Sequence, residues 1–86
     1  MNREEITEQI DAILYKAAGE PSDWKKCTGE SVLTTDLGLS SADMLYVIVT
    51  AEEQFGIRFD LSEFSKCKTV GDIADLISKE KERLAQ

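Results

Sequence analysis

The sequence contains no histidine and only two cysteines. Histidine is the commonest general base and a common metal ligand, so its absence excludes a Ser-His-Asp triad and weakens the case for a metal site. Cys27 and Cys67 are forty residues apart and form no CxxC motif, which gives no support for a zinc or thioredoxin-like site. We therefore expect two free thiols in a reducing compartment.

Long hydrophobic runs and clustered positive charge are also missing. No apolar stretch approaches the roughly 20 residues that cross a bilayer. The first five residues are polar and acidic, unlike a signal peptide. The ten Lys and Arg residues are scattered, which argues against nucleic acid as a partner. We expect a cytoplasmic protein that binds neither membranes nor nucleic acids.

Apolar and acidic residues dominate what is present. The 86 residues are 42% hydrophobic and carry a net charge of −7. This composition predicts one soluble globular domain over residues 1–86. A chain of this length buries only about two-thirds of its unfolded surface, which leaves little room for an enclosed catalytic cleft. The acidic surface favours partners with basic patches, although solubility alone explains such a charge equally well.

Hydrophobic periodicity predicts three main helices and one short helix. The first main helix covers about residues 3–18 and the second about Ser41 to Phe55, each followed by a glycine. A long connection over residues 20–39, rich in turn-forming residues, separates them. The elements together predict an all-α fold, a small helical bundle.

The last third of the chain contains the other two predicted helices. Asp60 can cap a short helix over residues 61–65, and the last main helix begins near Thr69 or Val70. Its charged tail, residues 78–86, is expected to fray.

Each segment supplies apolar residues for a predicted core. These are Ile6, Ile10, Ile13, Leu14 and Ala17 in the first helix, Trp24, Val32, Leu33 and Leu37 in the connection, Met44, Val47, Ile48, Ala51 and Phe55 in the second helix, Ile57, Phe59, Leu61 and Phe64 around the short helix, and Val70, Ile73, Ala74, Ile77 and Leu84 in the last helix.

The second helix carries more apolar residues than one buried face can use. Ala42, Leu45 and Val49 fall on another face, with Tyr46 beside them. The acidic residues Asp43, Glu52 and Glu53 flank this face. An apolar patch with an acidic rim is typical of an interaction site, whereas a central helix buried on two sides explains the pattern equally well.

Two adjacent serines stand at the predicted start of this helix. Ser40 fits the N-cap, with Asp43 three residues later as in a capping box. Ser41 then lies in the first turn with its hydroxyl free. The unpaired N–H groups and the dipole of a helix start stabilise negative charge, so this hydroxyl suits phosphorylation or a cofactor linked through phosphate. Ordinary capping remains the alternative role for either serine.

Catalysis by the chain itself is not expected. The acidic residues Asp36, Asp43, Glu52 and Glu53 could pair, but nothing in the sequence indicates a desolvated pocket that would tune their protonation. We therefore predict a protein that is not an enzyme.

Three segments of this chain resemble the acyl carrier protein family. Residues 36–43, Asp-Leu-Gly-Leu-Ser-Ser-Ala-Asp, resemble the D-L-G-x-D-S-L-D segment of that family. Residues 52–55, Glu-Glu-Gln-Phe, match its E-E-x-F helix end, and residues 69–72, Thr-Val-Gly-Asp, match the start of its last helix. The resemblance covers nearly the whole chain and implies the four-helix bundle of the acyl-carrier type.

By this resemblance Ser41 is the residue that carries covalent 4′-phosphopantetheine, whose thiol holds an acyl or aminoacyl group as a thioester. The implied partners are a phosphopantetheinyl transferase and acyl-loading or acyl-transfer enzymes with basic docking patches, acting on a monomer. The implied partner-binding residues are those of the second helix: Ala42, Asp43, Leu45, Tyr46, Val49, Glu52 and Glu53.

The sequence departs from the family pattern around Ser41. The family's aspartate before the serine is Ser40 here, its leucine after the serine is Ala42, and Tyr46 replaces a usual acid. These departures suggest a dedicated partner in a specialised pathway of secondary or peptide-product biosynthesis. The alternative is a carrier-like interaction module whose serine is never modified.

Overall fold

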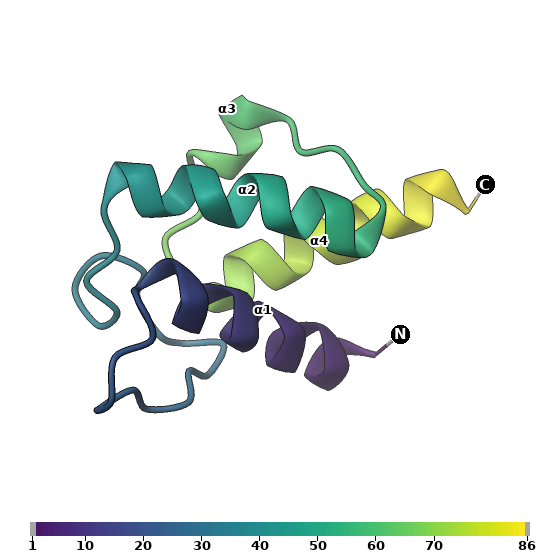
Figure 1. The fold of residues 1–86 in the computed structure, drawn as a ribbon. Coiled ribbons are helices and arrows are strands. Elements are labelled where there is room, and N and C mark those ends of the chain that lie inside the picture. The colour runs from purple at the N-terminus through teal and green to yellow at the C-terminus, as the bar shows by residue number, and fades with distance from the viewer. Residues whose placement is uncertain (1, 86) are drawn as a thin grey trace.

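The computed structural model describes residues 2–85, which form four α-helices (Figure 1). They are α1 (Arg3–Ala17), α2 (Ser41–Phe55), α3 (Leu61–Phe64) and α4 (Val70–Leu84). Within these residues the only extended pairing is an isolated bridge between Val32 and Thr69. The all-α prediction is confirmed. None of the helices in residues 2–85 is both long and apolar enough to cross a membrane.

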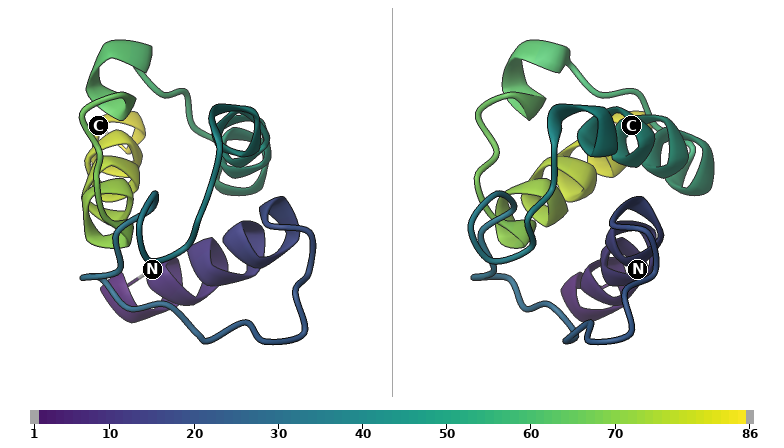
Figure 2. Two further views of the ribbon diagram at one scale, coloured as in Figure 1. Left: turned by 90° about the vertical axis from the view of Figure 1, so that its left-hand side faces the viewer. Right: turned by 60° about the vertical axis from the view of Figure 1, so that its left-hand side comes forward.

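The helices pack around one hydrophobic core. α1 packs against both α2 and α4, and α3 packs against α4. In the left view of Figure 2, α2 and α4 lie on opposite sides, with α1 below them and α3 above. The core residues come from every helix and from the connections: Ile6, Ile10, Ile13, Leu14, Cys27, Leu33, Leu39, Val47, Ala51, Phe55, Ile57, Phe59, Phe64, Val70, Ile73, Ala74, Leu76 and Ile77.

Reciprocal capping boxes fix the starts of the three long helices. The N-cap residues are Asn2, Ser40 and Thr69. In each box the N-cap side chain accepts a hydrogen bond from the backbone N–H of the third helical residue, and the acidic side chain of that residue accepts one from the N-cap N–H. The predicted caps of α2 and α4 are thereby confirmed, as is Asp60 at the start of α3. Gly56 ends α2 with φ +68°, a conformation that favours glycine.

Backbone hydrogen bonds attach the long connection to the start of α4. The N–H of Leu33 donates to the Lys68 carbonyl at 2.9 Å, and the N–H of Gly71 donates to the Gly29 carbonyl at 2.8 Å. A Cβ at Gly71 would lie 2.7 Å from the Gly29 oxygen, so this approach requires glycine. This part of the connection is therefore held in place against the start of α4 by backbone hydrogen bonds.

Asp11 of α1 binds the first half of the connection through two hydrogen bonds. Its Oδ1 accepts hydrogen bonds from the Trp24 indole N–H at 3.1 Å and from the backbone N–H of Cys27 at 2.9 Å. Cys27 and Leu39 are buried, although the sequence did not place either in the core. Both lie in a segment without helical periodicity, so no pattern marks them as core residues.

Several core predictions are wrong. Leu61 and Leu84, both predicted to be core residues, are exposed. Leu61 stands on a four-residue helix, which is too short for periodicity to define a buried face. Leu84 is the last residue of α4, and its side chain is solvent-exposed.

The predicted fraying of the C-terminal tail is also wrong for most of its length, because α4 remains helical to Leu84. Lys81 and Arg83 stand in its last turn, where positive charge complements the helix dipole. Glu80, expected in a solvated end, is buried and accepts a hydrogen bond from Arg83 at 3.0 Å.

Candidate functional site

Ser40 and Ser41 have different environments although they are neighbours. Ser40 lies just outside α2, and its Oγ accepts a hydrogen bond from the Asp43 N–H at 3.2 Å. The Asp43 carboxylate in return accepts from the Ser40 N–H at 2.8 Å. The hydroxyl of Ser40 is therefore occupied in capping the helix.

Ser41 is the first helical residue of α2 and is exposed. In the described part of the chain its hydroxyl makes no hydrogen bond. The amide groups of the first turn and the positive end of the helix dipole lie beside it. An anionic group esterified to this oxygen, such as a phosphodiester, would meet favourable electrostatics at an exposed position.

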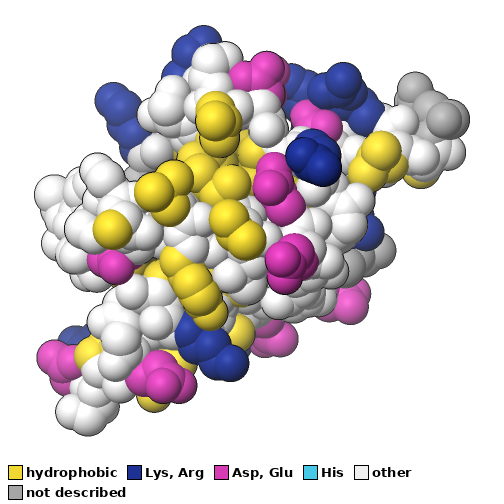
Figure 3. All heavy atoms as spheres, turned by 45° about the horizontal axis from the view of Figure 1, so that its top comes forward, with side chains coloured by type: hydrophobic (Ala, Val, Ile, Leu, Met, Phe, Trp, Pro, Cys, Tyr) yellow, Lys and Arg dark blue, Asp and Glu magenta, His cyan; other side chains and the backbone are white. Residues whose placement is uncertain are grey.

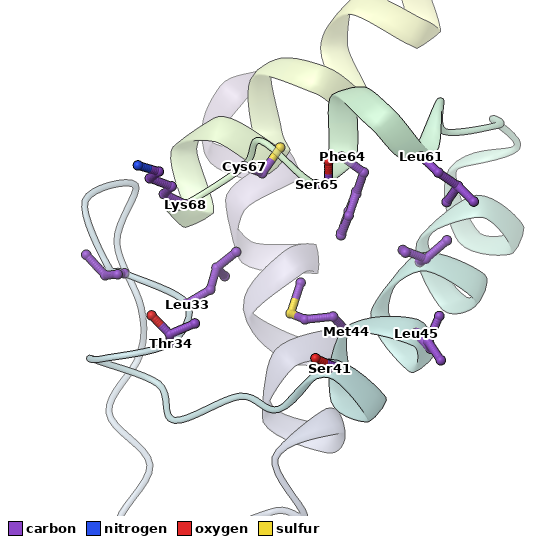
Figure 4. A pocket seen from close by; sticks show the side chains of 12 residues that line it. Leu33, Thr34, Ser41, Met44, Leu45, Leu61, Phe64, Ser65, Cys67 and Lys68 are labelled. Atoms are coloured by element: carbon purple, nitrogen blue, oxygen red, sulfur yellow. The ribbon is translucent and has the colours of Figure 1, made fainter.

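A cavity of about 580 Å³ opens beside Ser41 (Figure 4). Its walls come from the long connection, α2, α3 and the segment joining α3 to α4. The lining residues are Val32, Leu33, Thr34, Ser41, Met44, Leu45, Ile48, Leu61, Phe64, Ser65, Cys67 and Lys68.

The wall formed by the helices is apolar. Met44, Leu45 and Ile48 line the cavity from α2, and Leu61 and Phe64 line it from α3. Predominantly apolar lining with a few polar groups at the edge is typical of a pocket for an apolar ligand. A hydrocarbon group tethered near Ser41 could leave water by entering this cavity.

The second apolar face of α2 is open to solvent. Leu45 is 64% exposed, Val49 is 55% exposed and Tyr46 is 43% exposed, and Ala42 is also exposed. Figure 3 shows hydrophobic side chains forming a band across this side of the molecule, with acidic side chains along one flank. The alternative that α2 is buried on two sides is therefore wrong for the isolated chain.

The buried face of α2 is narrower than predicted. Val47, Ala51 and Phe55 are buried, whereas Met44 and Ile48 are only partly buried because they face the cavity.

The three acids predicted on this helix differ in their contacts. Asp43 is held in the capping box, and Glu52 accepts a hydrogen bond from the Phe59 N–H at 2.8 Å. Glu52 thus ties α2 to the segment that leads to α3, which the sequence did not indicate. Glu53 is exposed and has no hydrogen bond or ion pair within residues 2–85. Its carboxylate is fully available to a partner.

The cysteines are free thiols, as expected. Burial, together with a hydrogen bond to Asp11, raises the pKa of Cys27 to about 12. Burial, together with the charges of Asp72 and other acids, raises the pKa of Cys67 to about 11. Both thiols are therefore protonated and weakly nucleophilic near neutral pH. Residues 2–85 contain no cluster of three or more His, Cys, Asp or Glu side chains arranged to hold a metal.

The sequence did not reveal the cavity or its polar edge. Thr34, Ser65, Cys67 and Lys68 come from two segments without regular periodicity, and their proximity depends on the backbone bond between Leu33 and Lys68. A weak signal was present, because α2 carries more apolar residues than one buried face can use, and one of the surplus residues, Leu45, lines the cavity.

Comparison with known proteins identifies the family to which the chain is similar. Residues 28–77 match the family model described as "Phosphopantetheine attachment site", a span that contains Ser41 and all of the cavity lining. The chain is 37% identical over 78 residues to an acyl carrier protein of Acidothermus cellulolyticus, covering 91% of this chain and 90% of that protein. It is 35% identical over 78 residues to one of Thermotoga maritima, covering 91% and 94% of the two chains.

A solved structure agrees in fold. The solution structure of a holo acyl carrier protein from Geobacter metallireducens superposes with a TM-score of 0.77 at 28% identity, covering 93% of this chain and 90% of that one. The similarity thus extends over nearly the whole chain in both sequence and fold.

Proposed function

The chain belongs to the acyl carrier protein family, and we propose that Ser41 is the residue to which its 4′-phosphopantetheine is attached. The supporting observation is the contrast between the two serines. The hydroxyl of Ser40 is occupied in the capping box, whereas that of Ser41 is exposed at the start of α2. The cofactor fits there because the helix start favours its phosphate.

The cargo is proposed to be an acyl group. When bound, the cofactor supplies a thiol that holds the cargo as a thioester. The chain contributes the apolar cavity beside Ser41, which can remove a hydrocarbon tail from water. An aminoacyl cargo fits less well, because an ammonium group in an apolar cavity would lose its hydration without a carboxylate to pair with.

The open face of α2 is proposed as the partner-docking surface. It consists of Ala42, Asp43, Leu45, Tyr46, Val49, Glu52 and Glu53. The exposed apolar residues supply area that a partner can bury, and the acids supply steering towards basic patches. The partners are a phosphopantetheinyl transferase and enzymes that load and transfer the acyl group, and the carrier itself acts as a cytoplasmic monomer.

We further propose a specialised biosynthetic pathway. Ser40 and Ala42 on either side of the attachment residue, and Tyr46 on the docking face, alter the surface that a transferase or acyl-transfer enzyme meets first. A dedicated set of partners is the expected counterpart of such a surface.

Intact mass spectrometry tests the attachment residue. Wild type, Ser41→Ala and Ser40→Ala are incubated with coenzyme A and a promiscuous phosphopantetheinyl transferase. The wild type and Ser40→Ala should gain the mass of the arm, whereas Ser41→Ala should not. Labelling of Ser41→Ala together with loss of labelling in Ser40→Ala would overturn the assignment. A folded wild type that is never labelled would favour the unmodified interaction module.

A further inference from the structure

The cavity beside Ser41 differs in charge from the rest of the molecule. The chain has 17 acidic and 10 basic residues, yet no acidic residue lines the cavity. Its one charged lining residue is Lys68. Among the described residues, the side chains that line this cavity therefore include one positive and no negative charge, although Asp72, Asp75 and Glu63 act on its wall at Cys67 from outside the lining.

Lys68 lies at the edge of this cavity, away from its apolar end. In Figure 4, Lys68 stands beside Cys67 on the same side of the cavity as Leu33 and Thr34, with its ammonium nitrogen directed outward, whereas Leu45 and Leu61 stand at the opposite end. The backbone carbonyl of Lys68 accepts the Leu33 N–H at 2.9 Å, which fixes residue 68 against this wall. Its methylene stem lines the cavity and its ammonium group remains in water at the edge.

The ammonium group of Lys68 is available to a ligand. It forms no salt bridge within residues 2–85. The neighbouring acid is Asp72, whose Oδ2 accepts hydrogen bonds from the backbone N–H groups of Lys68 at 2.9 Å and Thr69 at 3.1 Å. These hydrogen bonds and, to a smaller extent, the Lys68 charge lower the pKa of Asp72, but Lys68 forms no ion pair with it in residues 2–85. Thr34, also exposed and at this end, adds a hydroxyl that can donate a hydrogen bond.

We infer that Lys68 determines cargo specificity, by pairing with a carboxylate at the far end of an otherwise apolar acyl chain. The inference rests on the proposed attachment at Ser41. A charged chain end cannot be buried in the apolar part without a partner, so it must emerge at an edge. The end lined by Thr34 and Lys68 offers polar groups to such a carboxylate, whereas Leu45 and Leu61 line the opposite end with apolar side chains.

The expected preference is modest, because the pair would be partly exposed. Exposed ion pairs stabilise by about 0.2–1 kcal/mol, which corresponds to a factor of about 1.4 to 5 in an equilibrium. An ammonium at the same chain end would be repelled by Lys68, so the contrast between the two charged ends should lie in the upper part of this range.

The test loads three matched cargoes. Wild type is charged by a promiscuous transferase with coenzyme A thioesters of an eight-carbon acyl chain that ends in a methyl, a carboxylate or an ammonium group. Loading is verified by intact mass. The half-life of each protein thioester in water is then divided by that of the same free coenzyme A thioester, which gives the protection by the cavity. Protection of the carboxylate cargo should exceed that of the ammonium cargo about two- to fivefold.

Charge variants at residue 68 test the role of its charge, because a purely structural role would not change which charged cargo is better protected. Lys68→Gln should equalise the two charged cargoes, and Lys68→Glu should reverse their order. Lys66→Gln is the matched control, since Lys66 is exposed and lies outside this cavity, and it should behave as wild type.

The outcomes separate the two proposals. Equal protection of the charged cargoes in wild type, or the same order in Lys68→Glu, would overturn the role of Lys68. Absence of the mass shift on loading would instead overturn the proposed attachment. A Lys66→Gln variant that loses the preference would show that general surface charge, and not Lys68, sets it.

Discussion

α2 and α4 are built alike but use their apolar residues differently. Each has 15 residues and begins with a reciprocal capping box. In α4 the apolar residues Val70, Ile73, Ala74 and Ile77 are completely buried, and the outward face is mainly charged. In α2 the outward face carries Leu45, Tyr46 and Val49, which remain in solvent.

The difference agrees with the proposal that α4 serves stability and that α2 serves recognition as well. A helix that only closes a core needs one apolar stripe, as α4 has. α2 has a core stripe, a wall of the cavity and an exposed apolar face at the same time. Apolar side chains left in water contribute little to folding, which supports the proposed docking role of this face.

The largest expected effect is the loss of stability when the buried stripe of α4 is truncated. Ile77→Ala should lower the free energy of unfolding by about 2–5 kcal/mol, because it opens a cavity at a fully buried position. Leu45→Ala should change it by no more than about 0.5 kcal/mol. Urea unfolding of both variants measures the contrast. Equal large losses would mean that α2 is needed for the core on both faces.

The next largest effect concerns recognition. Leu45→Ala should weaken docking to a phosphopantetheinyl transferase by about 1–2 kcal/mol, because a partner would lose buried apolar contact. The measurement is kcat/KM for coenzyme A transfer, where the loss should reach about five- to thirtyfold. Leu84→Ala is the matched control, since Leu84 is equally exposed but lies at the end of α4. Equal losses in both variants would remove the distinction between the helices.

Removal of the N-cap side chain should destabilise the protein by a similar amount at α2 and at α4. Ser40→Ala and Thr69→Ala should each lower the free energy of unfolding by about 1 kcal/mol, because each leaves the N–H of the third helical residue without its partner. Thermal melts of the two variants provide the comparison. A loss confined to one helix would show that its capping box is not the main determinant of its start.

The smallest effect is a pH dependence at the start of α4. Hydrogen bonds from the backbone N–H of Lys68 and then of Thr69 lower the pKa of Asp72 below its usual value. The folded state therefore holds this proton less tightly than the unfolded state, so the stabilisation is complete above about pH 4 and is lost as the pH falls through the lowered pKa. Because the carboxylate is exposed, the change is small.

Melting temperatures of wild type and Asp72→Asn between pH 2 and pH 5 test this dependence. The difference between the two proteins should shrink towards low pH, where Asp72 becomes protonated. A constant difference over the whole range would show that the carboxylate charge contributes nothing.

Local signals explain what the sequence predicted correctly. The bounds of α2, its cap at Ser40 and the free position of Ser41 follow from residues within one or two turns of each other. The exposed face of α2 also follows from spacing, although the sequence left open whether it was buried. The stripe of α4 was predicted up to Ile77 for the same reason.

Nonlocal contacts explain what the sequence missed. Cys27 is buried because Asp11 holds its backbone, and Lys68 reaches the cavity because its carbonyl binds Leu33. Neither pairing has a periodic signal. Leu84 fits the helical period but is left exposed, which shows that periodicity predicts a face and not the extent of the core that covers it.

The capping box of α2 also resolves an ambiguity in the chain. Two identical hydroxyls stand side by side, and a helix beginning one residue later would make Ser41 the N-cap and leave Ser40 outside the helix. In that register the third helical residue would be Met44, which has no carboxylate to return the bond. Asp43 supplies it only when Ser40 is the cap. The position proposed for attachment is therefore encoded two residues beyond Ser41, in a side chain that takes no part in the proposed ester.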